Sequence, residues 1–245
     1  MEILGFQTVN SLPALYHPDL DLLVISDLHL GLEKTMTFRG NYIPQHQLQQ
    51  VKEDIETARE ESGASRILVN GDLKNEFRTS SAEEDEIEQL LEMMEEVFED
   101  IIVVKGNHDT MVEEQKFSSE FVDCQLENRI LFIHGDKVLD ELEIGGEFDM
   151  IVIGHEHPAL ALEDEIGVRE KIDCFLYGET RRKENIIVLP AFSDISNGTS
   201  VNETPQSQLL SPLLRNRVDI EDLMAVGVSR QAGIMEFTQL EKLRQ

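Results

Sequence analysis

The first half of this 245-residue chain alternates short apolar segments with longer amphipathic ones, and this alternation constrains the fold more than any other feature. Runs at Leu20–Ile25, Arg66–Val69 and Ile101–Val104 are rich in Val, Ile and Leu, which is typical of strands buried on both faces. The intervening segments Gln45–Ser62 and Glu86–Phe98 carry apolar residues at helical spacing. This order of strands and helices predicts an α/β fold.

Each of these three strands runs into a polar turn that carries metal-binding side chains. Asp27 and His29 follow the first strand. Asp72 follows the second and Asn107 the third, each close behind a glycine. Residues two apart in an extended chain project to the same side, so Asp27 and His29 are expected to face one point. Because ligand sites in α/β sheets form at the carboxyl ends of strands, we expect the three turns to meet.

The second half is richer in strands, and two of them again end in histidines. His134 follows one strand, and His155 and His157 follow another. At positions i and i+2, His155 and His157 are expected to point to one side, whereas Glu156 should point away and is assigned no role. The strands expected in this half are Arg129–Ile133, Met150–Ile153, Lys171–Tyr177 and Asn185–Leu189. The two halves are expected to form two packed sheets within a single domain, residues 1–245.

Three segments are expected to lack long regular elements. Glu33–Tyr42 is predicted to be a connector, because Gly40 and Asn41 lie within it. Arg181–Lys183 is predicted to be a hairpin turn, and Ser200–Arg217, with its two prolines, a polar loop.

The charge balance is extreme, with 21 Lys and Arg against 49 Asp and Glu and a formal net charge of −28. Such a surface suits a salt-rich cytoplasm or attracts divalent cations. It speaks against a broad basic footprint for nucleic acid, which leaves nucleic acid as a partner only through a small local patch. Cys124 and Cys174 form no CxxC pattern, so neither a disulfide framework nor a zinc–thiolate site is expected. With no signal peptide and no membrane span in the sequence, we expect a cytoplasmic protein that does not contact membranes.

The candidate ligands are all oxygen or nitrogen donors, without a thiolate. They suit Mn²⁺, Fe, Zn²⁺ or Co²⁺ better than Ca²⁺, and we expect Mn²⁺. Seven ligands are too many for one ion but suit two ions that share a carboxylate, the arrangement that promotes in-line displacement at phosphate esters. The seven are Asp27, His29, Asp72, Asn107, His134, His155 and His157.

His108 is the remaining histidine in the ligand-bearing turns. We predict that it is the general acid for the leaving alkoxide and that Asp109 orients it. The alternative role for His108 is a hydrogen bond that supports the ligands. Lys74 follows the second turn and is either a solvated cation or a contact for a phosphate oxygen.

These motifs, in this order along residues 24–158, resemble the calcineurin-like metallophosphoesterase superfamily. The resemblance implies a four-layer αββα sandwich of two mixed sheets flanked by helices. It also implies that Asp72 bridges two metal ions. The motifs are Asp27-x-His29, Gly71-Asp72, Gly106-Asn107-His108-Asp109, His134 and Gly154-His155-x-His157. In the family pattern, Asp27, His29, Asp72 and His157 hold one ion, and Asp72, Asn107, His134 and His155 hold the other.

Within the superfamily, the sequences of three motifs resemble those of the archaeal ICC-like phosphoesterases. The bacterial relatives of that group are associated with DNA ligase and repair helicase genes. The three motifs are Asp27-Leu28-His29-Leu30-Gly31, Gly71-Asp72-Leu73-Lys74 and Leu189-Pro190-Ala191-Phe192. One departure concerns the further acid or histidine that many members carry beyond the bridging aspartate, a position at which Glu76 is the candidate here.

The sequence therefore predicts a metal-dependent phosphoesterase, a hydrolase of phosphate esters that uses two divalent ions. A phosphodiesterase or nuclease linked to DNA repair is the favoured form. The alternatives are a small-molecule phosphomonoesterase and a non-catalytic, metal-dependent scaffold. The sequence leaves the natural substrate and the oligomeric state open.

Overall fold

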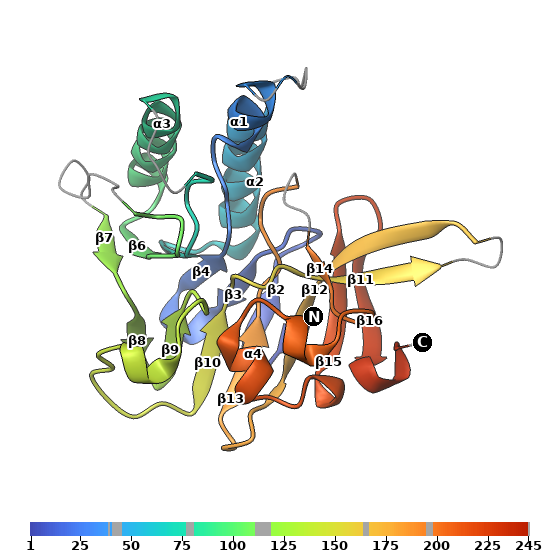
Figure 1. Cartoon of the computed structure of the whole chain (residues 1–245). Helices are drawn as coiled ribbons and strands as arrows, with labels where there is room; N and C mark the ends of the chain where they lie inside the picture. Colours follow the sequence, from blue (N-terminus) through green and yellow to red (C-terminus); the bar gives the residue numbers. More distant parts are fainter. Residues whose placement is uncertain are drawn as a thin grey trace.

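The computed structural model describes residues 1–38, 40, 46–76, 81–110, 119–163, 167–194 and 198–244. Two β-sheets pack face to face, and the helices α1 to α3 lie together above them in Figure 1. The α-helices are α1 (Leu32–Phe38), α2 (Gln47–Ser62), α3 (Ser81–Val97) and α4 (Pro212–Asn216). Among the described residues, no helix is long and apolar enough to span a membrane.

The first sheet contains seven described strands in simple sequence order, β1 to β7. Strands β4 to β7 run parallel, and β1 to β4 are joined by antiparallel pairings. The strands are β1 (Glu2–Ile3), β2 (Phe6–Thr8), β3 (Leu15–His17), β4 (Leu22–Ile25), β5 (Arg66–Asn70), β6 (Asp100–Val104) and β7 (Glu120–Val122).

The second sheet contains nine described strands and is also mixed. Its centre is the parallel set β9, β10 and β13, and the β11–β12 pair extends as a long arm to one side in Figure 1. The strands are β8 (Gln125–Glu127), β9 (Ile130–Ile133), β10 (Met150–Ile153), β11 (Pro158–Glu163), β12 (Arg169–Glu179), β13 (Asn185–Val188), β14 (Thr199–Ser200), β15 (Met224–Ser229) and β16 (Gly233–Gln239).

Alternate side chains of the central strands enter different core layers, which explains why these strands are apolar throughout. In β4, Leu23 and Ile25 pack in one layer with Val51 and Ile55 of α2. Their neighbours in β4 face the second sheet and pack in a layer shared with β9, β10 and β13. Side chains that alternate along a strand thus bury both of its faces. The expected αββα sandwich of two mixed sheets is confirmed.

The outer layer on the second sheet is thin and is built largely from a segment that we expected to be a loop. Ser200–Arg217 includes helix α4, whose Leu213 and Leu214 are buried against the second sheet together with Leu209. Pro212 occupies the start of this helix, where a proline costs no hydrogen bond. The loop prediction was therefore wrong for the part of the segment that covers the sheet.

Other boundaries also differ from expectation. Helix α1 (Leu32–Phe38) overlaps the first six residues of the connector predicted at Glu33–Tyr42, while residues 39 and 41–45 lie outside the described part of the chain. Helix α3 begins at Ser81 rather than Glu86, because the acidic residues of its first turn suit the positive end of a helix. The hairpin turn predicted at Arg181–Lys183 is confirmed between the antiparallel strands β12 and β13.

Candidate metal centre

The polar turns after strands β4, β5, β6, β9 and β10 converge where the two sheets meet. Their side chains form three overlapping groups in which one ligand atom from each residue lies within 4.8 Å of the others. The groups are Asp27 with His29 and His157, His29 with Asp72 and His108, and Asp72 with His134 and His155. Such mutual distances among carboxylate and imidazole donors are those of a site for metal ions.

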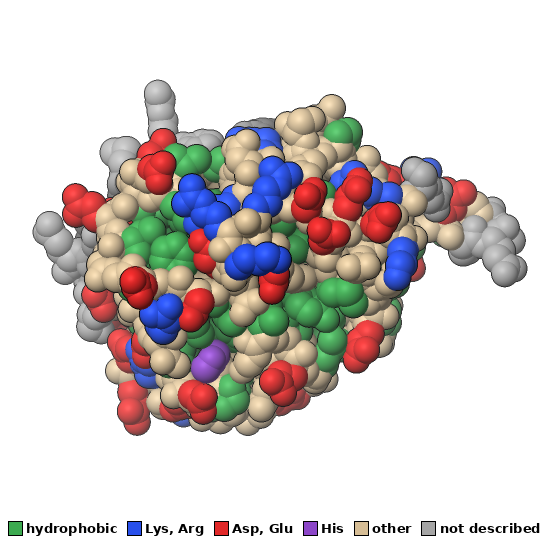
Figure 2. Space-filling view, turned by 90° about the horizontal axis from the view of Figure 1, so that it is seen from below, with side chains coloured by type: hydrophobic (Ala, Val, Ile, Leu, Met, Phe, Trp, Pro, Cys, Tyr) green, Lys and Arg blue, Asp and Glu red, His purple; other side chains and the backbone are tan. Residues whose placement is uncertain are grey.

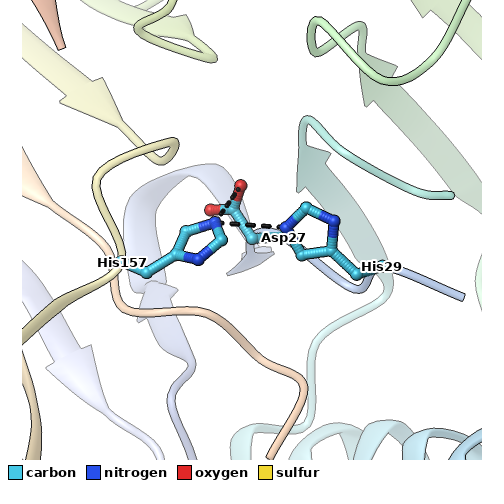
Figure 3. Close-up of side chains that lie close together, drawn as sticks. All are labelled: Asp27, His29 and His157. Carbon is cyan, nitrogen blue, oxygen red and sulfur yellow. Dashed lines mark hydrogen bonds and ion pairs between the residues drawn. The ribbon is translucent and has the colours of Figure 1, made fainter. Parts of the chain in front are cut away.

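The first group is drawn in Figure 3, where Asp27 and His29 come from the turn after β4 and His157 comes from the turn before β11. His157 Nε2 lies 3.0 Å from Asp27 Oδ1 and 3.2 Å from His29 Nε2. Asp27 is fully buried, and His29 is only 6% exposed. Two imidazole nitrogens and a carboxylate oxygen therefore point at one another in a site that water reaches poorly.

The second ligand group, Asp72 with His134 and His155, lies beside the first, and the remaining set of His29, Asp72 and His108 shares one residue with each. His134 Nε2 is 3.3 Å from Asp72 Oδ2, 3.2 Å from His155 Nδ1 and 3.1 Å from Asn107 Oδ1. The other ring nitrogen of His134, Nδ1, lies 3.2 Å from the backbone oxygen of Asn70. A proton on Nδ1 that bonds to this carbonyl would leave the lone pair of Nε2 for a bound metal ion, as a metal ligand requires.

Asp72 joins the two groups. Its Oδ2 lies 3.3 Å from His134 Nε2 and 3.9 Å from His29 Nε2, whereas its Oδ1 accepts a 2.9 Å hydrogen bond from the backbone N–H of His108. One carboxylate thus faces nitrogens of both groups. The buried donor set, with no thiolate, fits two divalent transition metal ions better than Ca²⁺.

The charges of the site favour bound cations. Burial lowers the pKa of His29 and of His155 to about 4, so both imidazoles are neutral at pH 7 and keep a lone pair available. Burial acts in the same direction on His134, but its hydrogen bond with Asp72 and the charges of Asp27 and Asp72 outweigh burial and raise the pKa of His134 to about 10. The buried carboxylates therefore draw positive charge into the site.

The backbone of the turns differs from what we expected. Asp27, His29, Asp72, His155 and His157 all have positive φ angles, between 46° and 65°. The expectation that an extended chain directs Asp27 and His29 to one side was therefore wrong in its reason, although the two side chains do meet. Left-handed backbone is rare for residues with a side chain and is concentrated at functional sites.

His155 and His157 were expected to point to one side, and this expectation was also wrong. His155 lies with His134, and His157 lies with Asp27 and His29. The left-handed backbone at both positions sends the side chains to different groups. Glu156 points away, as expected, because it is buried and its Oε2 accepts the backbone N–H of Ser211 at 2.9 Å.

Two glycines allow the turns to approach one another. A Cβ on Gly106 would overlap the carboxylate and backbone nitrogen of Asp72. A Cβ on Gly154 would overlap Ser26 Oγ and lie 2.5 Å from Asp27 Oδ2. Each glycine therefore lies against a carboxylate supplied by a different turn, and any larger residue would displace a candidate ligand.

His108 lies beside the two groups, with Nε2 3.9 Å from Asp72 Oδ2. The contact that orients its ring is between Nδ1 and the backbone oxygen of Asn75. We expected Asp109 in this role, but its two carboxylate oxygens accept backbone N–H groups of Leu73 at 2.8 Å and Gly106 at 2.9 Å. Asp109 therefore ties two ligand-bearing turns together.

Lys74 and Glu76 lie in the segment that follows Asp72. Lys74 is fully buried and its Nζ donates to the backbone oxygen of Glu76, so it is neither a solvated cation nor exposed to a substrate in this conformation. Burial lowers the pKa of Lys74. Among the described residues, none of the three ligand groups includes Glu76.

Three residues that support the ligands could not be predicted from the sequence. Ser26 Oγ lies 2.5 Å from Asp27 Oδ2, Asn70 contacts both sheets, and Gln47 Nε2 donates to the backbone oxygen of His29 at 2.9 Å. Ser26 and Asn70 stand next to or near the acids of their motifs, but nothing in an isolated sequence separates them from ordinary turn residues. Gln47 belongs to a distant helix, so only the fold brings it to the site.

Part of the chain matches the model of a known protein family. The family model for calcineurin-like phosphoesterases matches residues 20–136, a range that contains Asp27, His29, Asp72, Asn107 and His134. Residues 20–136 are therefore similar to the calcineurin-like phosphoesterases. The matched range ends before His155 and His157, which the fold brings to the same site. A search of curated proteins found no match.

Two solved structures were compared with this chain. The crystal structure of the nuclease MPE of Pseudomonas putida aligns with a TM-score of 0.57 and 17% identity over 88% of this chain and 88% of that chain. A phosphoesterase of E. coli, YfcE, aligns with a TM-score of 0.42 and 20% identity over 73% and 83% of the two chains. At this identity the first likeness supports the sandwich fold and carries no conclusion about substrate.

Proposed function

We propose that this protein hydrolyses phosphate diesters at a two-metal centre in which Mn²⁺ is the working ion. The observation that carries the proposal is the position of Asp72, whose Oδ2 faces imidazoles of both ligand groups. A carboxylate so placed serves two ions at once, and two ions roughly 3.5–4 Å apart stabilise both the attacking and the leaving oxygen of an in-line displacement.

The proposed assignment divides the ligands by their contacts. Asp27, His29 and His157 hold one ion, and Asn107, His134 and His155 hold the other, with Asp72 shared. Bound divalent cations would supply positive charge against the phosphate oxygens and make water a better nucleophile near neutral pH. The buried carboxylates and neutral imidazoles of the chain fix where that charge sits.

His108 supplies the proton in this proposal. The hydrogen bond between its Nδ1 and the Asn75 carbonyl leaves Nε2 directed toward the shared carboxylate and the reacting phosphate. Because Nδ1–H donates to that carbonyl, Nε2 carries a proton only in the doubly protonated imidazolium. In that form Nε2–H would donate its proton to the departing alkoxide and leave a neutral imidazole, a role worth about 10²–10⁴-fold in rate. The neighbouring Asn107 faces His134, so the turn places a ligand and a proton donor side by side.

A diester is the favoured substrate, and a strand of DNA is the macromolecular form that we propose to test. The sequences of Gly71–Lys74 and Leu189–Phe192 support membership of the narrower ICC-like group, and this membership is part of the proposal. We also propose that the protein works in the cytoplasm, where its free thiols Cys124 and Cys174 would stay reduced.

The test is hydrolysis by metal-stripped protein refilled with Mn²⁺. Bis-p-nitrophenyl phosphate, p-nitrophenyl phosphate and single-stranded DNA are offered in parallel. We expect the wild type to hydrolyse the diesters faster than the monoester. We expect His108→Ala to hydrolyse DNA about 10²–10⁴-fold more slowly than the wild type. The loss should be smaller on p-nitrophenyl esters, because p-nitrophenolate leaves without a proton.

His46→Ala is the matched control, because His46 is an exposed histidine that precedes helix α2 and whose side chain does not cap it. Preference for the monoester would replace the proposal with a phosphomonoesterase. Firm Mn²⁺ binding without hydrolysis of any ester would replace it with a non-catalytic scaffold.

A further inference from the structure

Asn70 is a fully buried amide at the end of strand β5, two residues before Asp72. We propose that Asn70 is a positioning residue that holds the second ligand group, Asp72 with His134 and His155, in register across the two sheets. The inference rests on the proposed two-metal centre, but it concerns how the chain builds that centre and not what the centre hydrolyses.

The side-chain amide of Asn70 reaches from the first sheet to the second. Nδ2 donates to the backbone oxygen of Ile133 at 3.0 Å and to that of Val152 at 3.2 Å. Ile133 immediately precedes His134, and Val152 lies three residues before His155. One amide on β5 therefore ties the ends of both second-sheet strands, β9 and β10, that supply the histidines of this group.

The backbone oxygen of Asn70 adds two further contacts at the same place. It faces Nδ1 of His134 at 3.2 Å and accepts the hydroxyl of Ser26 at 2.9 Å. Ser26 in turn lies against Asp27. The residue thus orients the imidazole of the second group and touches the support of the first.

The remaining atom of the amide argues that stability alone does not account for Asn70. Its Oδ1 is buried and has no hydrogen-bond partner among the described residues. A buried acceptor without a partner destabilises a fold, and such a group calls for an explanation beyond packing. The amide faces two carbonyl oxygens, and the two N–H groups of Nδ2 can donate to both of them only in this orientation of the side chain.

Removal of the amide should therefore loosen one ligand group and not the whole molecule. Without Nδ2, the carbonyls of Ile133 and Val152 lose a common partner, and His134 and His155 are free to shift relative to Asp72. Groups that orient metal ligands typically contribute about 10–100-fold to metal affinity. The first group keeps Asp27, His29 and His157 and should bind nearly as before.

Asn202→Ala is the matched control. Asn202 is also buried, and its amide bonds to both backbone groups of Ala161 at 2.9 Å, in the arm formed by β11 and β12. Asn202→Ala therefore removes a comparable set of hydrogen bonds at a place where no candidate ligand takes part. Both variants should lower the melting temperature, and only Asn70→Ala should change metal binding.

The measurement is titration of the metal-stripped full chain with Mn²⁺ alone, followed by calorimetry and by the electron paramagnetic resonance signal of coupled Mn²⁺ pairs. We expect two ions in the wild type and in Asn202→Ala. In Asn70→Ala, one ion should bind about 10–100-fold more weakly and the coupled signal should be lost at equal loading. If Asn70→Ala does not fold, Asn70→Ser, which keeps a buried hydroxyl too short to reach both carbonyls, provides the same comparison.

Wild-type affinity for both ions in Asn70→Ala would overturn the inference, as would an equal loss in Asn202→Ala. A wild type that binds fewer than two ions would contradict the inference together with the metal centre. Two bound ions without hydrolysis of any ester would refute only the proposed function, and the role of Asn70 would stand.

Discussion

Several residues of the candidate metal centre have a left-handed backbone conformation, which is rare for residues other than glycine. Eleven non-glycine residues of the described chain have positive φ, and five of them are candidate ligands. Each such residue costs on the order of 1 kcal/mol or more, so the surrounding contacts have to hold it. Hydrogen bonds such as that of Gln47 to the carbonyl of His29 provide this support.

Asp21, another residue with positive φ, gives a prediction about pH that is independent of the metal centre. Its Oδ1 accepts the hydroxyl of Tyr16 at 3.0 Å, and its Oδ2 accepts the hydroxyl of Ser65. The bond from Ser65 is the main cause that lowers the pKa of Asp21 below its ordinary value of 3.8. The ionised carboxylate therefore stabilises the fold above about pH 4, and this contribution is lost as the pH falls through the lowered pKa.

Asp21→Asn should accordingly be less stable than the wild type near neutral pH, and the difference should shrink below about pH 4. Urea unfolding of both proteins between about pH 3 and 7 measures it. Ser65→Ala should reduce the same pH dependence, because it removes the main cause of the lowered pKa. A difference that grows on acidification would show that the carboxylate is not preferentially ionised in the folded state.

Among the secondary-structure elements, the buried strands could be predicted from the sequence. The backbone conformation of the ligand-bearing turns could not. The apolar runs that end at Ile25, Val104 and Ile133 are strands because both of their faces are buried, and burial leaves a plain mark on composition. The left-handed turns leave no such mark, since Asp and His are ordinary in loops. Helix α1 was missed because its seven residues are too few for a clear period, and α4 because polar residues surround it.

Gly154 tests the close approach of two turns. Gly154→Ala adds one methyl group against Ser26 Oγ and Asp27 Oδ2, so Asp27 must shift. We expect at least a tenfold loss of Mn²⁺ affinity and a destabilisation of about 1–3 kcal/mol, typical of overpacking. Gly145→Ala is the control, because no atom lies within 4 Å of a Cβ at that exposed glycine. Unchanged Mn²⁺ affinity in Gly154→Ala would mean that the turn adapts without moving Asp27.

At the scale of the whole molecule, the net charge of −28 was evident from the sequence, but its distribution was not. Figure 2 shows a face on which Lys and Arg side chains lie among Asp and Glu with apolar side chains between them. Among the described residues, several Lys and Arg side chains pair with acids at the surface, as Arg129 with Asp149 at 2.8 Å and Lys183 with Glu179 at 2.9 Å. Exposed pairs of this kind add little stability, so they temper repulsion more than they hold the fold.

The packing of one sheet on the other is the feature that the sequence left least visible. The family resemblance implied that His155 and His157 serve different ions, but the geometry that separates them depends on turns at the junction of both sheets. Asn70 links the sheets at that junction through contacts 63 and 82 residues away along the chain. No local pattern encodes contacts of this range.

We propose that one carboxylate, Asp72, serves two metal ions, and the decisive measurement is the number of ions that each folded chain binds. Metal-stripped wild type and Asp72→Ala are dialysed against Mn²⁺, and bound metal per folded chain is measured by mass spectrometry of the digested protein. We expect two ions per wild-type chain and at most one, weakly held, in Asp72→Ala, because both ligand groups lose their shared carboxylate. Two firmly bound ions in Asp72→Ala, or a single ion in the wild type, would contradict this proposal.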